Sequence, residues 1–124
     1  YLEGAKRVAH YFLANIGPDG IPALDFRAPR ESKYIDTTAG SIAASGLLEI
    51  EKLVPDGEKG LYRTGAERIL QGLWSQCDFS VEEDSILQNG SEAYHTVRHI
   101  PIIYGDYFLL EALMKIQGKG LLLW

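Results

Sequence analysis

Between Thr37 and Leu48 the sequence contains no charged residue, and seven of the eight residues from Ala39 to Gly46 are Ala, Gly or Ser. The stretch is part of a predicted helix, Thr37–Val54, which ends at a Pro-Asp-Gly turn signal. Glycine inside a helix lowers its stability by about 1 kcal/mol relative to alanine, so Gly40 and Gly46 indicate another source of stability. Small side chains let neighbouring backbones approach closely. We therefore expect this helix to be buried nearly all round.

Two other segments have the pattern of amphipathic helices that pack one face against a core. They are Leu2–Ile16 and Gly57–Cys77, and both place charged residues opposite an apolar stripe. Cys77 is interpreted as a small core residue at the end of the second helix. The apolar stripes consist of Leu2, Ala5, Val8, Ala9, Phe12, Leu13 and Ile16 in the first and Leu61, Tyr62, Ala66, Ile69, Leu70, Leu73 and Trp74 in the second.

The stretch from His99 to Gly118 predicts a loop that leads into a fourth helix, Tyr107–Ile116. Asp106 stands at the start of this helix, and Asp36 stands at the start of the charge-free helix. Both are interpreted as structural acids, because the unpaired N–H groups at a helix start can donate hydrogen bonds to a carboxylate. The apolar face of the fourth helix is predicted to contain Tyr107, Leu110, Leu113 and Met114.

The four predicted helices alternate between helices with a charged, solvent-facing side and helices that are expected to be buried. This alternation is typical of an α/α toroid, in which inner helices line a ring, outer helices shield them and long loops at one end form a site. A four-helix bundle would show similar amphipathic stripes on all four helices, so the pattern favours the toroid. Residues 21–35 form a long irregular connection of the kind that is usually functional or mobile. Asn89-Gly90 is a turn signal for two short extended pieces.

The balance of 12 basic and 17 acidic residues, a formal charge of −5, argues against nucleic acid or an anionic membrane as the partner. A single cysteine excludes an internal disulfide framework and a multi-thiolate zinc site. No apolar run is long enough to span a bilayer. Because the chain starts at Tyr1, almost inside a helix, we interpret it as an excerpt from a longer protein. A cytoplasmic location is expected, with a periplasmic or secreted one left open.

Two motifs together resemble one family. DFRAPRESKYIDTTAGSIAASGLLEI, residues 25–50, followed by IYGDYFLLEALMKI, residues 103–116, is similar to the C-terminal third of the unsaturated glucuronyl hydrolases, glycoside hydrolase family 88. The resemblance implies an all-α fold that is part of an (α/α)6 six-hairpin barrel, with about two hairpins present. Residues 1–124 would then be the C-terminal portion of a single catalytic domain. The family usually has tryptophan before its Asp-Phe pair, where this sequence has Leu24.

The resemblance also implies an activity. Members of the family remove an unsaturated uronic acid from the non-reducing end of oligosaccharides that polysaccharide lyases produce. They hydrate the vinyl ether double bond without a cofactor, and an aspartic acid acts as general acid and base. The catalytic aspartates lie upstream of the matched region, so no catalytic residue is expected in this chain, and Asp25, Asp36 and Asp106 are not assigned to catalysis. The expected partners are such an oligosaccharide and either the missing N-terminal part of the barrel or a second copy.

Candidate substrate-binding residues lie in the loops. Four of them, Ser91, Tyr94, His95 and Arg98, occupy the loop that forms part of the pocket rim in relatives, and Asp25 and Tyr104 complete the set. Arg98 offers a planar fork for a carboxylate or sulfate. The alternative is that the loop residues are solvated, that Asp25 pins its own loop, and that Tyr104 and Phe26 are core aromatics.

No metal site is expected. His95 and His99 are four residues apart, which is the spacing of two metal ligands on a helix, but the stretch between them has the pattern of a loop and brings no third ligand.

Two alternatives to the glucuronyl hydrolase interpretation remain open at this point. The related unsaturated rhamnogalacturonyl hydrolases would share the architecture and differ in the sugar accepted. An independent all-α interaction module without catalysis would instead cover Thr37–Leu48 completely with its own chain. A piece of a barrel predicts the opposite, with large apolar areas exposed on Thr37–Val54 and Tyr107–Ile116.

Overall fold

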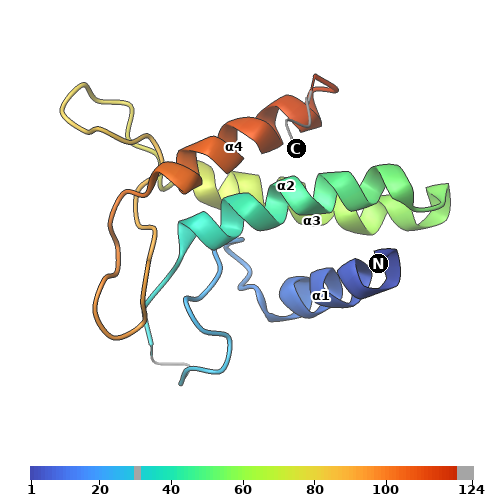
Figure 1. Cartoon of the computed structure of the whole chain (residues 1–124), viewed down its shortest axis with the longest axis horizontal. Coiled ribbons are helices and arrows are strands. Elements are labelled where there is room, and N and C mark those ends of the chain that lie inside the picture. The colour runs from blue at the N-terminus through green and yellow to red at the C-terminus, as the bar shows by residue number, and fades with distance from the viewer. Residues whose placement is uncertain (30–31, 120–124) are drawn as a thin grey trace.

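The computed structural model describes residues 1–29 and 32–119, and its regular structure consists of four helices (Figure 1). The loops of the described ranges contain three isolated antiparallel bridges, and no β-strand extends beyond such a bridge. Helices α1 and α3 run in one direction and α2 and α4 in the opposite direction (Figure 1). The all-α class is therefore confirmed. The helices are α1 (Leu2–Asn15), α2 (Thr37–Leu53), α3 (Asp56–Trp74) and α4 (Ile103–Ile116).

Helix α2 is the central element, because it packs against each of the other three helices. Its buried residues Leu47 and Leu48 join a core to which α3 contributes Tyr62, Ile69 and Leu73, all fully buried. The expectation of close approach is confirmed at Gly40. A Cβ atom there would lie 3.1 Å from Leu73 Cδ2 and 3.2 Å from a ring carbon of Pro22, so a larger side chain would push α3 and the preceding loop away.

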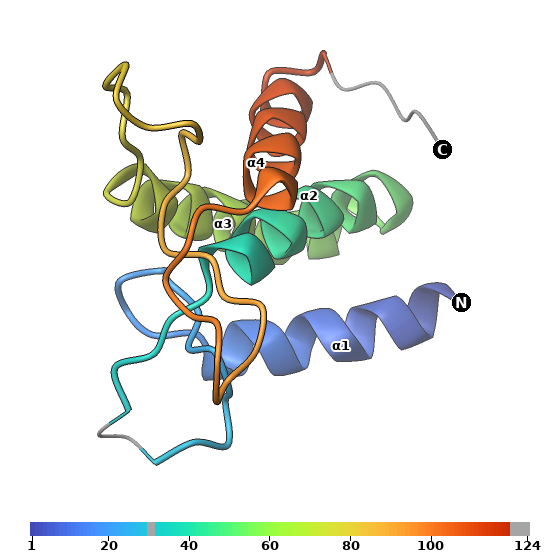
Figure 2. The ribbon, with the colours of Figure 1, turned by 60° about the vertical axis from the view of Figure 1, so that its left-hand side comes forward.

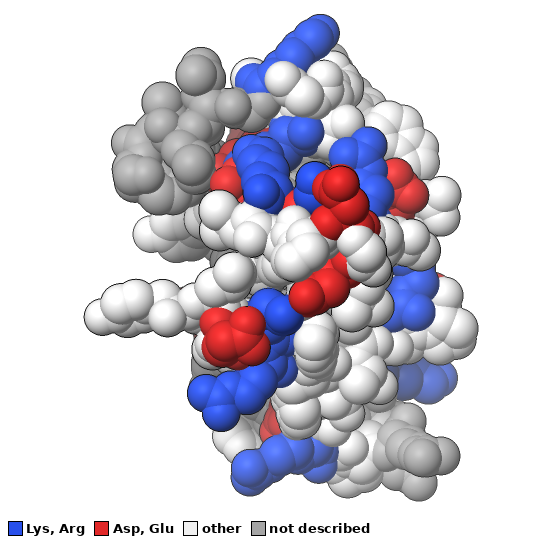
Figure 3. Space-filling model, turned by 90° about the vertical axis from the view of Figure 1, so that its right-hand side faces the viewer, with Lys and Arg blue, Asp and Glu red and all other residues white. Residues whose placement is uncertain are grey.

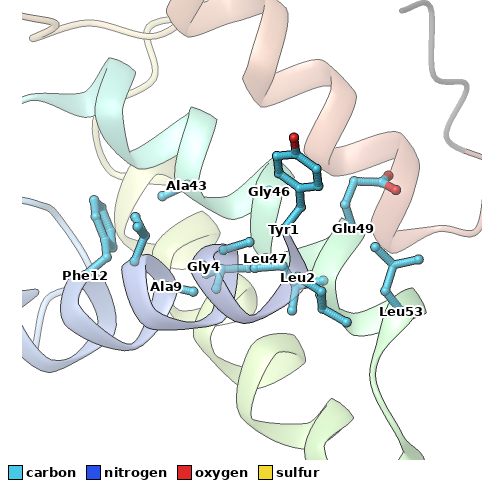
Figure 4. A pocket seen from close by; sticks show the side chains of 13 residues that line it. Tyr1, Leu2, Gly4, Ala9, Phe12, Ala43, Gly46, Leu47, Glu49 and Leu53 are labelled. Atoms are coloured by element: carbon cyan, nitrogen blue, oxygen red, sulfur yellow. The ribbon is translucent and has the colours of Figure 1, made fainter.

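The prediction that α2 is buried nearly all round is wrong for this chain. One stripe is open: Ile42 is 44% exposed, Leu53 is 65% exposed, and nothing lies within 4 Å of a Cβ atom built on Gly46. Gly46 and Leu53 of this stripe line a groove of about 590 Å³ between α1 and α2 (Figure 4). Apart from Glu49 and Tyr1, the groove is lined by apolar side chains and glycines. Within the described residues, α2 therefore has neighbours on three sides and an open apolar fourth side.

Polar contacts join α1 to α3, in addition to the packing of α1 against α2. Lys6 forms an ion pair with Glu58 at 2.6 Å, and His10 Nε2 lies 2.9 Å from the Tyr62 hydroxyl. His10 was interpreted from the sequence as a surface or cap residue. It is exposed, and its contact with Tyr62 also joins α1 to α3. The predicted apolar stripe of α1 is wrong at Val8, which is 70% exposed.

Figure 3 shows Lys and Arg interspersed with Asp and Glu on the face that carries the start of α1 and the turn between α2 and α3. Both signs of charge are therefore present side by side there. Among the described helices, none has the length and apolar character that crossing a bilayer requires.

Helix α3 ends earlier than predicted, at Trp74, and two of its predicted core residues are not in the core. Leu61 is 53% exposed and Trp74 is 62% exposed. Cys77 lies beyond the helix end in a bridge with Leu87, and it packs half-buried against the core. Burial raises the pKa of the Cys77 thiol, and the nearby Asp106 carboxylate adds to the shift. The prediction that Cys77 packs against the core is thus confirmed. The prediction that it lies in the helix is wrong, because α3 ends at Trp74.

Helix α4 begins at Ile103, four residues before its predicted start, so Gly105 lies inside the helix. Its buried face contains Leu109 and Ala112, and Leu113 of the predicted face packs half-buried against the core. The prediction is wrong at Leu110 and Met114, which are 54% and 44% exposed. The reason is that α4 has apolar residues on more than one side, and periodicity cannot tell which side α2 covers.

Asp106 is structural, as predicted, but it acts on a different segment from the one expected. Its carboxylate accepts hydrogen bonds from the Ser85 hydroxyl at 2.7 Å, the Ile86 N–H at 3.2 Å and the Leu87 N–H at 2.7 Å. The acid therefore fastens the loop between α3 and α4 to the first turn of α4, in place of capping its own helix.

A buried ionic group joins α2 to α4. Lys115 Nζ lies 2.7 Å from Glu111 Oε1 and 3.1 Å from Glu49 Oε1, and it donates to Ser45 Oγ at 2.9 Å. The Lys115 side chain is only 3% exposed and that of Glu111 only 7%. Burial alone would raise the pKa of Glu49, but hydrogen bonds from Lys52 and Lys115 outweigh it and lower that pKa. A buried carboxylate is costly without such a partner.

Replacing Gly72 by alanine is expected to destabilise the protein by about 2 kcal/mol, since overpacking of this kind typically costs about 1–3 kcal/mol. A Cβ atom at Gly72 would lie 2.3 Å from the Asp19 carbonyl oxygen, which is backbone and cannot rotate away. Gly60→Ala in the same helix is the matched control, because its Cβ would meet nothing within 4 Å and alanine favours helix by about 1 kcal/mol. Urea unfolding followed by circular dichroism measures both. Equal effects of the two substitutions would contradict the packing described here.

Replacing Lys115 by methionine is expected to lower the free energy of unfolding by about 3 kcal/mol, because it leaves the Glu111 carboxylate buried without its cation. Lys59→Met is the control: its ion pair with Asp56 lies at the surface, where such pairs contribute less than about 1 kcal/mol.

Because the pKa of Glu49 is lowered on folding, the contribution of this carboxylate to stability is present above its ordinary pKa of 4.5 and is lost as the pH falls. Urea unfolding at neutral and acidic pH should therefore show a smaller loss on acidification in Lys115→Met. An unchanged acid dependence would contradict this role.

Candidate functional site

Both long connections of the chain lie at the same end of the helices. Residues 16–36 connect α1 to α2 and residues 75–102 connect α3 to α4, whereas α2 and α3 are joined by two residues at the opposite end (Figure 1). In the view of Figure 2 the two connections again lie together beside the first turns of α2 and α4. This end of the molecule is the place where loop side chains from distant parts of the sequence can meet.

The start of α2 holds the two loops together. Asp36 is the N-cap of α2, as predicted, and its Oδ1 accepts from the Thr38 N–H and also from the Ser91 N–H, each at 3.1 Å. The Thr37 hydroxyl donates to the Gln88 carbonyl at 2.6 Å. Ser91 Oγ in turn donates to the Ile35 carbonyl at 2.8 Å. Ser91 is buried, so its observed role is to join the loops.

An aromatic cluster, which consists of Tyr34, Tyr94, His95, Arg98 and His99, forms where the loops meet. The Arg98 guanidinium carbon lies 4.1 Å from the centre of the Tyr34 ring, within cation–π range. Arg98 Nη1 donates to the Tyr94 carbonyl at 2.7 Å. The rings of Tyr34 and Tyr94 meet edge to face at 5.5 Å, and Tyr34 and His99 at 6.1 Å. Three of the predicted residues are thus brought together.

The two histidines of the cluster have different environments. His99 adopts a φ of 55° and its Nε2 accepts from the Ile35 N–H at 3.2 Å, so this histidine also joins the loops. His95 is exposed and its ring lies 5.0 Å from that of Tyr94. No group of three or more His, Cys, Asp or Glu residues in the described ranges is placed to hold a metal ion.

A shallow cavity of about 460 Å³ lies beside the cluster and is lined by Pro29, Ser32, Lys33, Tyr34 and Tyr94. Within the described part of the chain, neither Arg98 nor Lys33 forms an ion pair. Arg98 and Lys33, two cations without an ion pair among the described residues, therefore lie on the two neighbouring loops. An arginine with free N–H groups can bind a carboxylate or sulfate through two parallel hydrogen bonds.

The other predicted residues are not part of the cluster. Asp25 Oδ1 accepts from the Arg27 N–H at 2.8 Å within its own turn, which agrees with the interpretation that Asp25 pins its loop. Phe26 packs edge to face on Phe12 of α1 at 5.2 Å. Tyr104 is on the first turn of α4 and is 64% exposed. The turn predicted at Asn89-Gly90 has a positive φ of 63° at Asn89, but Gly90 pairs with Ile100.

Sequence reasoning did not identify Tyr34 or Lys33. Both lie in an irregular stretch without periodicity, and the partners of Tyr34 in the cluster are about 60 residues away in sequence. The hydrogen bonds that bring these partners together are made by backbone groups and by short side chains at the start of α2. No local pattern marks such a contact.

Known proteins with similar sequence and structure share one description. No family model matches the chain. It is 36% identical over 126 residues to an unsaturated glucuronyl hydrolase of Bacillus sp. GL1, covering 94% of this chain and 33% of that protein. The crystal structure described as unsaturated glucuronyl hydrolase from Bacillus sp. GL1, "responsible for the degradation of glycosaminoglycan", superposes with a TM-score of 0.84 and 33% identity, with 94% and 33% of the two chains covered.

A variant of the Streptococcus agalactiae unsaturated glucuronyl hydrolase, crystallised with dGlcA-GalNAc6S, matches with a TM-score of 0.84 at 27% identity and with 96% and 33% coverage. The chain spans about a third of the length of these proteins. Its four helices correspond to part of their helical toroid. By sequence and by structure, the chain is a homologue of the unsaturated glucuronyl hydrolases over nearly its whole length.

Proposed function

We propose that this chain is part of a glycoside hydrolase that releases unsaturated uronic acid from oligosaccharides produced by polysaccharide lyases. The observation that carries the proposal is the match to unsaturated glucuronyl hydrolases over 94–96% of the chain, in sequence and in helix arrangement. One matched structure contains an unsaturated uronyl disaccharide, dGlcA-GalNAc6S, which supports a carbohydrate as the ligand. The reaction would be hydration of the vinyl ether double bond, with general acid and base groups outside this chain.

Three aspartates of this chain, Asp25, Asp36 and Asp106, support that division of labour. Asp36 caps α2 and holds Ser91, and Asp106 accepts three hydrogen bonds from the loop at Ser85–Leu87. Asp25 is engaged with the backbone of its own turn. A general acid needs a carboxyl group that reaches the substrate. These three carboxylates instead serve the fold, so the chain would contribute barrel wall and pocket rim.

The aromatic cluster is the part of the rim that would meet the substrate. Arg98 carries an unpaired charge among the described residues and would bind a carboxylate or sulfate on the sugar beyond the unsaturated one. Tyr94 presents an aromatic surface for the C–H face of a sugar ring, and the exposed His95 lies beside it. Ser91 would act indirectly by holding the loop. Tyr104 and Asp25, which lie outside the cluster, are less suited to contact the same sugar.

The open apolar surfaces favour a piece of a larger domain over an independent interaction module. A module would cover Thr37–Leu48 with its own chain, yet Ile42 is 44% exposed, and Leu110 and Met114 of α4 are also open. A groove lined almost entirely by apolar groups separates α1 from α2. We expect further helices of the same barrel to cover these surfaces.

The test is release of unsaturated uronic acid, followed as loss of the ultraviolet absorbance of the double bond. The assay compares the 124-residue chain with a longer polypeptide that contains it and the other two thirds of the barrel. Sulfated dGlcA-GalNAc6S and its unsulfated counterpart are the substrates. Activity is expected in the longer polypeptide and not in the chain alone. Arg98→Ala is expected to raise KM for the sulfated substrate about tenfold, which corresponds to about 1.4 kcal/mol.

The control for Arg98→Ala is Arg7→Ala, an exposed residue on α1 at a distance from the loops. No release from any unsaturated uronyl substrate by the longer polypeptide would contradict the proposed function. Release of an unsaturated galacturonyl residue from rhamnogalacturonan fragments alone would instead support the related rhamnogalacturonyl activity.

A further inference from the structure

We infer that Tyr34 is a positioning residue, which holds the Arg98 guanidinium in the orientation needed to bind an anionic group on the substrate. The inference rests on the proposed function and extends it to a residue outside the segment 91–98. It follows from three features of the described loops: the anchoring of Tyr34, the placement of Arg98 on its ring, and the free edge of the guanidinium.

The backbone is paired at the Tyr34 carbonyl and at the next residue, Ile35. The Tyr34 carbonyl accepts from the Leu24 N–H at 2.9 Å, and Ile35 forms an antiparallel bridge with Ala23. The Ile35 N–H donates to His99 Nε2, and the Ile35 carbonyl accepts from Ser91 Oγ. The backbone at Tyr34 is thus held by contacts from both loops, and its ring contacts side chains of the second loop.

Arg98 has contacts on one face and at one corner of its guanidinium group. The ring of Tyr34 lies 4.1 Å from the guanidinium carbon, and Nη1 donates to the Tyr94 carbonyl at 2.7 Å. A cation–π contact uses the flat face of the group, whereas hydrogen bonds use its edge. The structure records no ion pair and no second hydrogen bond from Arg98 to the described residues. The ring therefore restricts the arginine without consuming the N–H groups that an anion needs.

This arrangement lowers the entropy that Arg98 would lose on binding. A free arginine side chain loses rotamer entropy when it is fixed. The contact with Tyr34 removes part of this loss before the ligand arrives. Tyr34 also lines the 460 Å³ cavity together with Lys33 and Tyr94, so the ring that contacts the guanidinium also borders a space that a sugar can enter. A sulfate or carboxylate on that sugar is the chemical group that fits.

The test compares Tyr34→Leu, which removes the ring, with Tyr34→Phe, which keeps it, in the longer polypeptide of the activity assay. Tyr34→Leu is expected to raise the KM for dGlcA-GalNAc6S, relative to the KM for the unsulfated disaccharide, about 2- to 10-fold, as expected for a cation–π contact of about 0.5–1.4 kcal/mol. Tyr34→Phe is expected to restore the wild-type ratio. Tyr11→Leu, on an exposed aromatic residue of α1, is the matched control.

An unchanged KM ratio in Tyr34→Leu would overturn the inference, as would equal effects of the Leu and Phe variants. A second measurement does not depend on activity. The Nε–Hε resonance of Arg98 in the 124-residue chain should lose its ring-current shift in Tyr34→Leu and keep it in Tyr34→Phe. Titration with sodium sulfate, against sodium chloride at equal ionic strength, should then move this resonance at lower concentration in wild type than in Tyr34→Leu. If the longer polypeptide is active but the Arg98 resonance does not change as described, the role of Tyr34 is refuted and the proposed function stands. If the resonance changes as described but the polypeptide is inactive, the proposed reaction is refuted and the contact between Tyr34 and Arg98 stands.

Discussion

The carboxylate of Asp36 is the contact on which the loop end of the molecule depends. A single oxygen accepts one N–H from the first turn of α2 and one from Ser91, 55 residues further along the chain. The N-cap thereby satisfies the helix start and sets the position of the second loop in the same interaction. Because α2 packs against all three other helices, both loops are placed relative to the core as a whole.

The composition of α2 follows from its neighbours. Gly40 lies where Pro22 and Leu73 approach from two sides, and any side chain there would displace them. On the side that faces α4 the small residue Ser45 leaves room for the buried Lys115. Gly46 has no such neighbour among the described residues, and it lies on the stripe that lines the apolar groove. A helix built to be approached from all sides here has one side open, as expected for an inner helix of an incomplete ring.

Residues of the helices were more predictable than residues of the loops, for a physical reason. Helical periodicity located all four helices, and Asp36 was recognisable as a cap from its position before a helix start. Periodicity failed at Leu110 and Met114 because an inner helix is apolar on several sides, so the pattern does not identify the side that α2 covers. The start of α4 was also predicted too late, because Asp106 was interpreted as the residue that begins the helix. Asp106 instead accepts hydrogen bonds from the loop at Ser85–Leu87. Tyr34 was missed because its partners come from the other loop.

The same separation between helices and loops explains how such a site can change its ligand without changing its fold. The loops are joined by backbone groups and by the short side chains of Asp36, Thr37 and Ser91, which lie beside α2. The long side chains of Tyr34 and Arg98 project from this frame and contact each other mainly through a ring face and a cation. Replacing such a pair alters which charge the rim presents, while the hydrogen bonds that position the loops stay in place. In the proposed function, the hydrogen bonds that join the loops would carry stability, and the pair of Tyr34 and Arg98 would carry specificity.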